Sequence, residues 1–367
     1  MRIMTIVGAR PEFIMTAPVS RAIRQRHEEI LVHTGQHYDD NMSEVFFTDL
    51  ALPQPDLNLG VGSGSHAEQT GTMLVRLEAA MRSEKPDWVL VYGDTNSTIA
   101  GSLAAVKLNI PLAHVEAGLR SFDRTMPEEI NRVLTDKVSS LLFAPTPVAV
   151  ENLRKEGITR GVHLVGDVRV DVLSDTLARV QGRQARLLAS TRLSGGGAFA
   201  LATIHRPSNT DHVERLKDIV ETFNTLELPV VIPVHPRLHK MMKAFDLRFS
   251  ENVVAIEPVG FLDMLALLDA CEIVITDSGG LQKESYILRR PTVTVRDTTE
   301  WVETVQSGWN RLCEPSPLAF KAAVAEARKK PPESHPDFYG AYGVSQRICA
   351  LLEETVVSDP AIAPAGF

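Results

Sequence analysis

At 367 residues the chain is long enough for two domains, and its 44% hydrophobic and 23% charged residues are ordinary for a globular protein. The formal net charge of −8 argues against nucleic acid or an anionic membrane as a partner. Three cysteines, Cys271, Cys313 and Cys349, have no metal-binding spacing and cannot all pair, which favours a reducing compartment. Since no signal-peptide pattern follows Met1 and no apolar run reaches membrane-spanning length, we expect a cytoplasmic protein.

Apolar runs and helix-like stretches alternate through the first half of the chain. We predict a helix from Pro11 onwards and buried strands over residues 3–7, 29–33, 88–92, 112–115, 141–144 and 162–165. Further helices are predicted over residues 65–82, 96–107, 127–138 and 146–156. This alternation is typical of a doubly wound parallel sheet built from βαβ units.

The alternation starts again after three consecutive glycines at residues 195–197. Strands are predicted over residues 198–204, 229–234, 253–256, 272–276 and 292–295, with helices over 213–225, 238–245, 262–268, 279–288 and 300–307. We place the domain change near residues 166–170 and expect a junction helix over 170–191, a final amphipathic helix over 345–355 and a loose tail over 359–367. Two similar α/β domains with facing strand tips leave a cleft, which is a favoured ligand site.

The stretch from Pro111 to Arg132 gathers acids and arginines where a predicted strand gives way to a helix. Glu116 follows the strand, and Glu128 lies in the first turn of the helix that begins at Pro127, a residue favoured at that position. Ligands of open α/β sheets bind at strand tips, so these carboxylates suggest acid–base chemistry on an anionic substrate. An ordinary loop followed by acids that favour a helix start explains the same residues.

Two turns in the same half supply further candidates. Gly8 ends the first strand before a helix, so backbone amides and Arg10 could bind a phosphate, although a structural arginine also fits. This turn lacks the three glycines of a dinucleotide fingerprint. Asp94 follows Gly93 at another strand tip and is a candidate base, although Asp is also a common helix N-cap.

Two histidines and a glycine pair follow strand ends in the second half. His205 and His235 each stand just beyond a strand, which suits a phosphate-facing role or proton transfer. The sequence TDSGGLQKES closes a strand and opens a helix at Ser278, so its backbone amides could hold a phosphate. Glu284, one turn further on, could accept both hydroxyls of a ribose.

Eight motifs occur in the order seen in the UDP-N-acetylglucosamine 2-epimerase family, which this chain resembles from Arg2 to about Thr355. They are GARPEF, GQH, GDTNST, HVEAGLRS, MPEEINR, HRPSNT, DSGGLQKE and RDTTE. The resemblance implies an α/β, glycosyltransferase-B-like fold of two Rossmann-like domains, a UDP-sugar substrate, no metal, no nicotinamide cofactor and a homodimer. It also implies that the last helix returns to the first domain, which gives domains of residues 1–168 with 341–358 and of residues 169–340.

The resemblance also assigns roles to the candidate residues. Asp94, Glu116, Glu128 and His205 match the family's catalytic positions, and we expect the carboxylates to converge within the width of one sugar, facing His205 and Ser278. Positions expected to hold the nucleotide are Arg10, Arg132, Ser278, Gly279, Gly280 and Glu284, with His235 on the phosphate side and uracil near Phe261. Because most nucleotide contacts lie in the second domain and the carboxylates in the first, catalysis is expected to require closure.

The implied reaction explains why several carboxylates are needed. The proton on C2 of the sugar is not next to a carbonyl, so its removal requires that the C1–O bond to UDP breaks first or nearly so. The protein then holds the departing diphosphate, and one carboxylate removes the C2 proton. A second acid returns a proton to the opposite face of the resulting 2-acetamidoglucal. The sequence leaves open which carboxylate serves which face.

Departures from the family pattern bear on outcome and regulation. Met15 stands where many members have a lysine, which removes a cation near the diphosphate or the carboxylates, although an apolar core contact also explains it. Release of UDP and free N-acetylmannosamine, as in hydrolysing relatives, is therefore an alternative outcome. Residues 36–46 and 60–69 lack the glutamine and arginine of members activated by a second UDP-N-acetylglucosamine, so we expect no such activation.

Other substrates and other classes of protein are also open. Residues 296–310 resemble the subgroup that epimerises UDP-diacetamido-glucuronate, which makes a uronate an alternative substrate. A glycosyltransferase would share the fold and the nucleotide contacts, but it would need an acceptor pocket in place of three carboxylates and would form no epimer from a UDP-sugar alone. A nucleotide-sugar-binding protein would leave every UDP-sugar unchanged.

Overall fold

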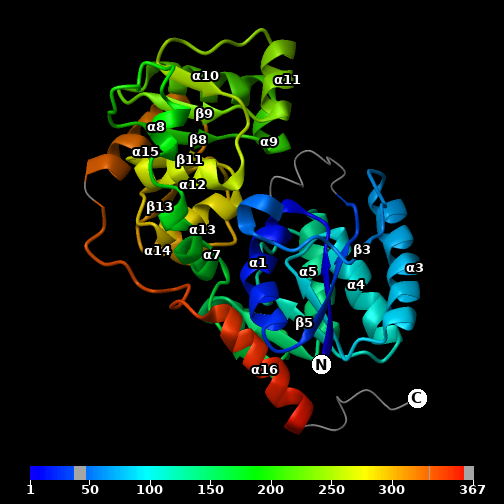
Figure 1. Cartoon of the computed structure of the whole chain (residues 1–367). Coiled ribbons are helices and arrows are strands. Elements are labelled where there is room, and N and C mark those ends of the chain that lie inside the picture. Colours follow the sequence, from blue (N-terminus) through cyan, green and yellow to red (C-terminus); the bar gives the residue numbers. More distant parts are fainter. Residues whose placement is uncertain (37–46, 330, 359–367) are drawn as a thin grey trace. The chain divides into compact units, whose positions relative to one another are not determined.

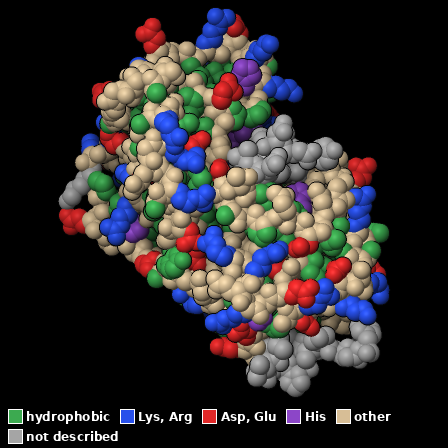
Figure 2. All heavy atoms as spheres, in the orientation of Figure 1, with side chains coloured by type: hydrophobic (Ala, Val, Ile, Leu, Met, Phe, Trp, Pro, Cys, Tyr) green, Lys and Arg blue, Asp and Glu red, His purple; other side chains and the backbone are tan. Residues whose placement is uncertain are grey.

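The computed structural model describes residues 1–36, 47–329 and 331–358. The chain forms two compact units, an N-terminal unit of Met1–Asp175 with Asp337–Phe367 and a C-terminal unit of Thr176–Pro336. Each unit is a parallel sheet with helices, so the predicted α/β class with two Rossmann-like domains is confirmed (Figure 1). No helix in the described ranges is long and apolar enough to span a bilayer. On the face shown in Figure 2, acidic and basic side chains are interspersed.

The N-terminal unit contains a seven-stranded parallel sheet in the order β3-β2-β1-β4-β5-β6-β7. Its strands are β1 (Arg2–Val7), β2 (Glu28–His33), β3 (Leu57–Asn58), β4 (Trp88–Tyr92), β5 (Leu112–Val115), β6 (Leu141–Ala144) and β7 (Val162–Leu164). Its helices include α1 (Arg10–Arg24), α3 (His66–Glu84), α4 (Asn96–Lys107), α5 (Pro127–Val138), α6 (Pro147–Lys155) and α16 (Val344–Ser358). Strand β4 is apolar and buried along its whole length, as a parallel strand covered on both faces must be.

The final helix, α16, belongs to the N-terminal unit, where it contacts α1. The carboxylate of Asp171 accepts hydrogen bonds from the amides of Gly343 and Ser345, each at 2.8 Å, and from the Ser345 hydroxyl at 2.7 Å. It also accepts the amide of Val344 at 3.2 Å. The first amides of a helix have no acceptor within the helix, so Asp171 caps α16 from a distant part of the chain.

The C-terminal unit contains a six-stranded parallel sheet in the order β10-β9-β8-β11-β12-β13. Its strands are β8 (Ala200–Thr203), β9 (Val230–Pro233), β10 (Val253–Ile256), β11 (Ile273–Thr276), β12 (Thr292–Thr294) and β13 (Asn310–Leu312). Its helices are α8 (Arg183–Leu187), α9 (Pro207–Thr210), α10 (Val213–Thr225), α11 (Pro236–Ala244), α12 (Phe261–Ala270), α13 (Gly279–Ile287), α14 (Val302–Gln306) and α15 (Pro317–Lys329).

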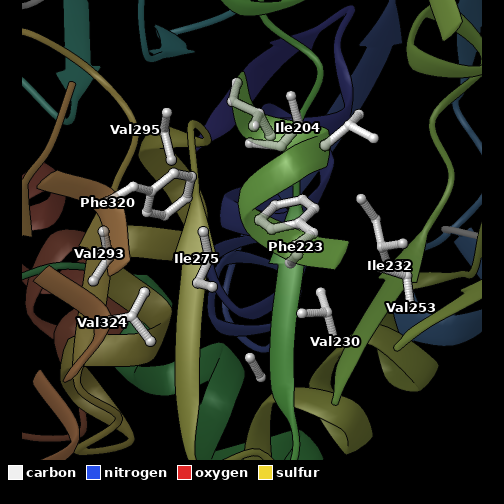
Figure 3. Close-up of a cluster of buried hydrophobic side chains, with 14 of the residues drawn as sticks. Ile204, Phe223, Val230, Ile232, Val253, Ile275, Val293, Val295, Phe320 and Val324 are labelled. Carbon is white, nitrogen blue, oxygen red and sulfur yellow. The ribbon is translucent and has the colours of Figure 1, made fainter. Parts of the chain in front are cut away.

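The core on one face of this sheet joins strands β8 to β12 to helices α10 and α15 (Figure 3). Phe223 of α10 and Phe320 of α15 meet edge to face, with ring centroids 5.9 Å apart. Beneath them Ile275 of β11 and Val293 of β12 are fully buried. This packing provides a rigid support for the polar turns that follow the strands.

One predicted element is wrong. The junction helix expected over residues 170–191 is divided into α7 (Arg169–Thr176), a 3-10 turn (Leu177–Arg179) and α8. Gly182 precedes α8 with a φ of +75°, and this left-handed conformation interrupts a helix. Strands β3 and β13 and helices α9 and α15 are additional to the predicted elements, and the predicted tail over 359–367 lies outside the described residues.

Strand adjacency places four polar turns in two neighbouring pairs. In the N-terminal unit β4 pairs with β5, so the turns that carry Asp94 and Glu116 are neighbours. In the C-terminal unit β8 pairs with β11, so the turns that carry His205 and Ser278 are neighbours. All four follow the carboxyl ends of parallel strands, which is the edge where doubly wound sheets bind ligands.

Candidate active site

Four residues of the N-terminal unit form what we call the N-terminal half-site: Asp94, Glu116, Glu128 and Arg132. The Asp94 carboxylate makes an ion pair with Arg132 while 25% of its side chain stays exposed. Burial raises the pKa of Asp94 above its ordinary value, and the charges of Glu116 and Glu128 raise it further, while Arg132 opposes the shift. The structure therefore brings the three predicted carboxylates into one electrostatic environment.

Glu116 has an unusual backbone conformation. Its φ of +75° lies in the left-handed region, which is strained for a residue with a side chain. A Cβ atom at Gly93 would lie 3.5 Å from Oε2 of Glu116 and 3.7 Å from Cε of Met15. The Glu116 carboxylate therefore faces the turn that carries Asp94, and the buried methyl group of Met15 lies beside it.

Two adjacent acids at the start of α5 have different surroundings. Glu129 is buried, and its carboxylate accepts the amides of Ser121 and Phe122 at 2.9 and 3.0 Å and lies 3.3 Å from a guanidinium nitrogen of Arg132. Glu128 is exposed. Glu129 thus holds the preceding loop, which leaves Glu128 as the acid that can reach a ligand.

The predicted anion cradle after β1 is wrong in one respect, because the chain fills it with its own carboxylate. Oε2 of the buried Glu12 accepts the amides of Gly8 at 2.6 Å and Ala9 at 2.9 Å, and Oε1 accepts the Thr95 hydroxyl at 2.5 Å. Burial raises the pKa of Glu12 to about 7. Only Arg10, half-buried at the start of α1, remains from the predicted phosphate site. The Glu in GARPEF, three residues after the N-cap, is the signal for this capping role.

The C-terminal half-site consists of His205, Asp277 and the start of α13. Nδ1 of His205 lies 2.9 Å from Oδ1 of Asp277, which is fully buried and which also accepts the Arg206 amide at 2.9 Å and the Asn209 amide group at 3.0 Å. Burial alone would raise the pKa of Asp277, but the hydrogen bonds and charge of His205 outweigh it, and the pKa lies below its ordinary value. Asp277 is therefore a carboxylate that keeps hydrogen on Nδ1 of His205.

Sequence reasoning did not assign a role to Asp277. Its position directly after β11, the neighbour of the strand that precedes His205, is the signal that could have found it, because residues at the ends of paired parallel strands meet.

Two other residues that were predicted to bind the nucleotide, His235 and Phe261, lie at helix starts. The exposed His235 is the N-cap of α11, and its Nδ1 accepts the Arg237 amide at 3.2 Å. Its ring centroid lies 5.5 Å from that of His205, so the two predicted histidines are neighbours. Phe261 is the first residue of α12 and is buried.

The start of α13 retains part of the predicted phosphate site. The Ser278 hydroxyl caps the helix by accepting the Leu281 amide, and the Ser278 amide already donates to the Thr276 hydroxyl at 2.9 Å. The amides of Gly279 and Gly280 lie in the first helical turn, where a helix offers no acceptor of its own. Glu284, the predicted ribose ligand, is 8% exposed on the same helix.

The start of α13 lies beside Trp301 and the Arg296–Glu300 ion pair. Both terminal guanidinium nitrogens of Arg296 lie 2.9 Å from the Glu300 carboxylate. Burial opposes ionisation of Glu300, but Arg296, with a smaller contribution from Arg206, lowers its pKa to about 2. A Cβ atom at Gly279 would lie 3.6 Å from Nε1 of Trp301, whose ring stacks under the ammonium group of Lys283. The RDTTE motif contains Arg296 and Glu300, but the sequence alone did not predict their ion pair.

The described residues include one group that could hold a metal ion, made of His27, Cys349 and Glu353. Nε2 of His27 and Oε1 of Glu353 already make an ion pair at 2.8 Å. This group joins α16 to the loop after α1, and the polar turns described above follow the opposite ends of the strands. The predicted differences at residues 36–46 lie mostly outside the described residues, since 37–46 are not among them.

Two parallel sheets, each with polar turns at the carboxyl ends of its central strands, define a protein of the glycosyltransferase-B-like class with two Rossmann-like domains. Residues 21–353 match the family model described as UDP-N-acetylglucosamine 2-epimerase, and the chain belongs to that family. It is 52% identical over 316 residues to a UDP-N-acetylglucosamine 2-epimerase homolog of Methanococcus maripaludis, covering 85% of this chain and 88% of that protein.

Two further relatives bear on substrate and structure. The chain is 46% identical over 357 residues to the UDP-2,3-diacetamido-2,3-dideoxy-D-glucuronate 2-epimerase of Pseudomonas aeruginosa, covering 96% of this chain and 99% of that protein. A crystal structure of the Methanocaldococcus jannaschii UDP-GlcNAc 2-epimerase, in complex with UDP-GlcNAc and UDP, superposes with a TM-score of 0.89 at 41% identity. That match covers 96% of this chain and 100% of the other.

Proposed function

We propose that this protein catalyses the reversible C2 epimerisation of UDP-N-acetylglucosamine to UDP-N-acetylmannosamine. Membership of the epimerase family supports the reaction class. The observation that carries the proposal is the Asp94–Arg132 ion pair beside Glu116 and Glu128, since a carboxyl whose pKa is raised by its surroundings is suited to general acid–base catalysis.

The proposed mechanism divides the work between the two half-sites. The C1–O bond breaks with its electron pair moving to the diphosphate, and one carboxylate of the N-terminal half-site takes the C2 proton, which leaves 2-acetamidoglucal and UDP. A second carboxyl group then donates a proton to the opposite face of C2, and the diphosphate oxygen adds back to C1. The net result is inversion at C2 with UDP retained.

Groups of the C-terminal half-site are suited to stabilise the departing diphosphate. Preorganised donors lower the barrier most when they point at the developing charge. The amides of Gly279 and Gly280 lie at the start of α13, and Arg206 and Arg296 lie close enough to the neighbouring Glu300 to lower its pKa. With hydrogen held on Nδ1 by Asp277, His205 can donate to a diphosphate oxygen from Nε2 when its ring is doubly protonated. Arg10 adds a guanidinium group from the N-terminal unit.

A UDP-diacetamido-glucuronate is the alternative substrate. The 46% identity to an epimerase of that sugar, extending along nearly the whole of both chains, favours it. The steps at C1 and C2 would be unchanged, because the uronate differs at C3 and C6.

Incubation of each UDP-sugar with the protein in deuterated water tests the proposal. Epimerisation predicts deuterium at C2 in a mixture of gluco and manno nucleotides with UDP still attached. Stoichiometric UDP and free N-acetylmannosamine would instead identify a hydrolysing enzyme. Reaction of the uronate alone would keep the reaction class and change the substrate. A UDP-sugar that stays unchanged until an acceptor is added would favour a glycosyltransferase.

Closure, dimerisation and a cytoplasmic location belong to the same proposal. Closure around the substrate would reduce the radius of gyration measured by X-ray scattering when UDP is added.

A homodimer would use apolar surface, and the exposed side chains of Ile130 and Leu134, one turn apart on α5, favour that helix as part of the interface. Sedimentation equilibrium measures the dimer, and Leu134→Glu should weaken it.

A further inference from the structure

A buried ionic cluster links the two turns that carry Asp94 and Glu116. It consists of His114 of β5, Asp136 of α5 and Arg120, and we call it the His114 cluster. Nε2 of His114 lies 2.7 Å from the Gly93 carbonyl oxygen, and Nδ1 lies 2.8 Å from Oδ1 of Asp136. The other oxygen of Asp136 accepts the Gly118 amide at 3.1 Å and a guanidinium nitrogen of Arg120 at 2.7 Å.

The hydrogen-bond pattern fixes the protonation of the His114 ring. A carbonyl oxygen can only accept, so Nε2 carries hydrogen. Burial alone would raise the pKa of Asp136, but its bonds to His114 and Arg120 outweigh burial and lower that pKa, so the group is a carboxylate that accepts from Nδ1. Both ring nitrogens of the fully buried side chain therefore face acceptors, a pattern that a doubly protonated, positively charged ring satisfies in full.

The charges of this region balance. Arg120 also makes two parallel hydrogen bonds to Glu156, at 2.7 and 2.8 Å, so two cations face two carboxylates. A buried ionic group of this kind is often no more stabilising than apolar side chains of the same volume. Fold stability alone therefore does not explain why the three residues of the His114 cluster and Glu156 occupy the space between β5, α5 and the end of α6.

The His114 cluster makes hydrogen bonds to the backbone of the two turns that carry Asp94 and Glu116. Gly93 has a φ of +59° and directly precedes Asp94, and its carbonyl is the group that His114 holds. Gly118 stands two residues after Glu116, which itself has a φ of +75°, and its amide is the group that Asp136 holds. One imidazolium–carboxylate pair thus connects two left-handed turns on adjacent strands.

We propose that the His114 cluster is a positioning device that sets the separation and direction of Asp94 and Glu116. This inference rests on the proposed function, in which both carboxylates exchange protons with C2. His114 acts only through the two turns and does not contact the sugar. Its effect should therefore fall on the chemical steps, because misplacement of a reacting group by about 1 Å can reduce a rate by roughly 100-fold.

The test compares His114→Gln with Glu156→Gln. The glutamine at 114 can still donate to the Gly93 carbonyl but cannot also reach Asp136, so the link between the turns is broken. We expect kcat and the rate of deuterium exchange at C2 to fall roughly 100-fold, while the Kd for UDP stays at its wild-type value. Glu156→Gln loosens the same ionic group at its outer end without touching either turn, so its kcat should stay at the wild-type value.

Two further measurements separate positioning from stability. If His114→Gln does not fold, Asp136→Asn carries the same test, because a neutral amide at 136 cannot hold the imidazolium. Nitrogen-15 NMR of the wild-type protein should show both ring nitrogens of His114 protonated at neutral pH. Wild-type kcat in His114→Gln, equal loss of kcat and UDP affinity, or a neutral ring would overturn the inference alone. Absence of C2 exchange in the wild-type protein would overturn the proposed function and this inference together.

Discussion

The imidazole of His205 and the carboxylate of Asp277, which follow two paired strands, form a dyad with Nδ1 and Oδ1 2.9 Å apart. Asp277 has no exposed surface, while 37% of the His205 side chain is exposed. The buried partner therefore decides which nitrogen of the exposed ring faces a ligand.

Replacement of Asp277 by Asn should disable His205 without removing it. An amide has no negative charge, so it cannot balance the positive His205 ring that donates from both nitrogens, to residue 277 and to the diphosphate. We expect kcat to fall by roughly 100-fold, the contribution typical of one acid–base group, with little change in the amount of folded protein. Asp211→Asn is the control, since Asp211 pairs with Arg237 on the surface. A kcat in Asp277→Asn equal to that of the control would show that the dyad has no catalytic role.

The two acids at the start of α5 should separate activity from stability. Glu128→Gln is expected to lower kcat at least 100-fold and leave the melting temperature unchanged, because the side chain is exposed. Glu129→Gln weakens the bonds to the amides of Ser121 and Phe122 and should lower the free energy of unfolding by about 1–3 kcal/mol. Kinetics and urea unfolding of both variants measure the contrast. The opposite result, with Glu129→Gln stable and inactive, would exchange the two assignments.

Glu12 should make the protein less stable as the pH rises. Its pKa is raised from 4.5 to about 7 in the folded state, so between these values the folded state binds more protons than the unfolded state. The free energy of unfolding should therefore fall by up to about 3 kcal/mol across this range. Glu12→Gln keeps a neutral acceptor for Gly8 and Ala9 and should remove this fall. Urea unfolding at pH 5 and pH 8 tests it, and equal pH dependence in both proteins would contradict the prediction.

Met15 offers a test of UDP retention. Met15→Lys would place an ammonium group beside the Glu116 carboxylate, near the turn that carries Asp94. If a cation there helps to hold the diphosphate near the glycal, the variant should release less free UDP per epimerisation than the wild-type protein. Met15→Leu, which keeps an apolar side chain of similar volume, is the matched control. Equal UDP release from the Lys and Leu variants would show that this position does not affect retention.

The strands of both sheets could be predicted closely because buried parallel strands are continuous apolar runs that end at glycine or a polar residue. Strands β4, β5, β6 and β10 and helices α4, α5 and α10 have the predicted bounds. The two-residue strand β3 is too short to show a periodic pattern. Its pairing with β2 also joins residues that are far apart in the sequence. The junction helix was wrong because its apolar spacing continues past Gly182, where the backbone turns left-handed.

Prediction of the candidate site succeeded where a residue follows a strand and failed where its role depends on a distant partner. The positions of Asp94 and Glu116 follow from the ends of β4 and β5. The occupation of the Gly8 turn by Glu12 depends on the Thr95 hydroxyl from another turn, and the role of Asp277 depends on the order of strands. The catalytic roles, the approach of the two half-sites and the domain boundaries at residues 168 and 340 stay predictions.

The cap that Asp171 provides to α16 spans 172 positions of the chain, and this has a consequence for synthesis on the ribosome. The C-terminal unit, Thr176–Pro336, emerges complete before α16 has been made. The second unit can therefore finish folding first, the reverse of the usual order in multidomain chains. A nascent chain stalled after Pro336 should expose the surface of the N-terminal unit that the buried Ile348 and Leu352 of α16 would cover. Such a chain should bind a chaperone until the last helix arrives.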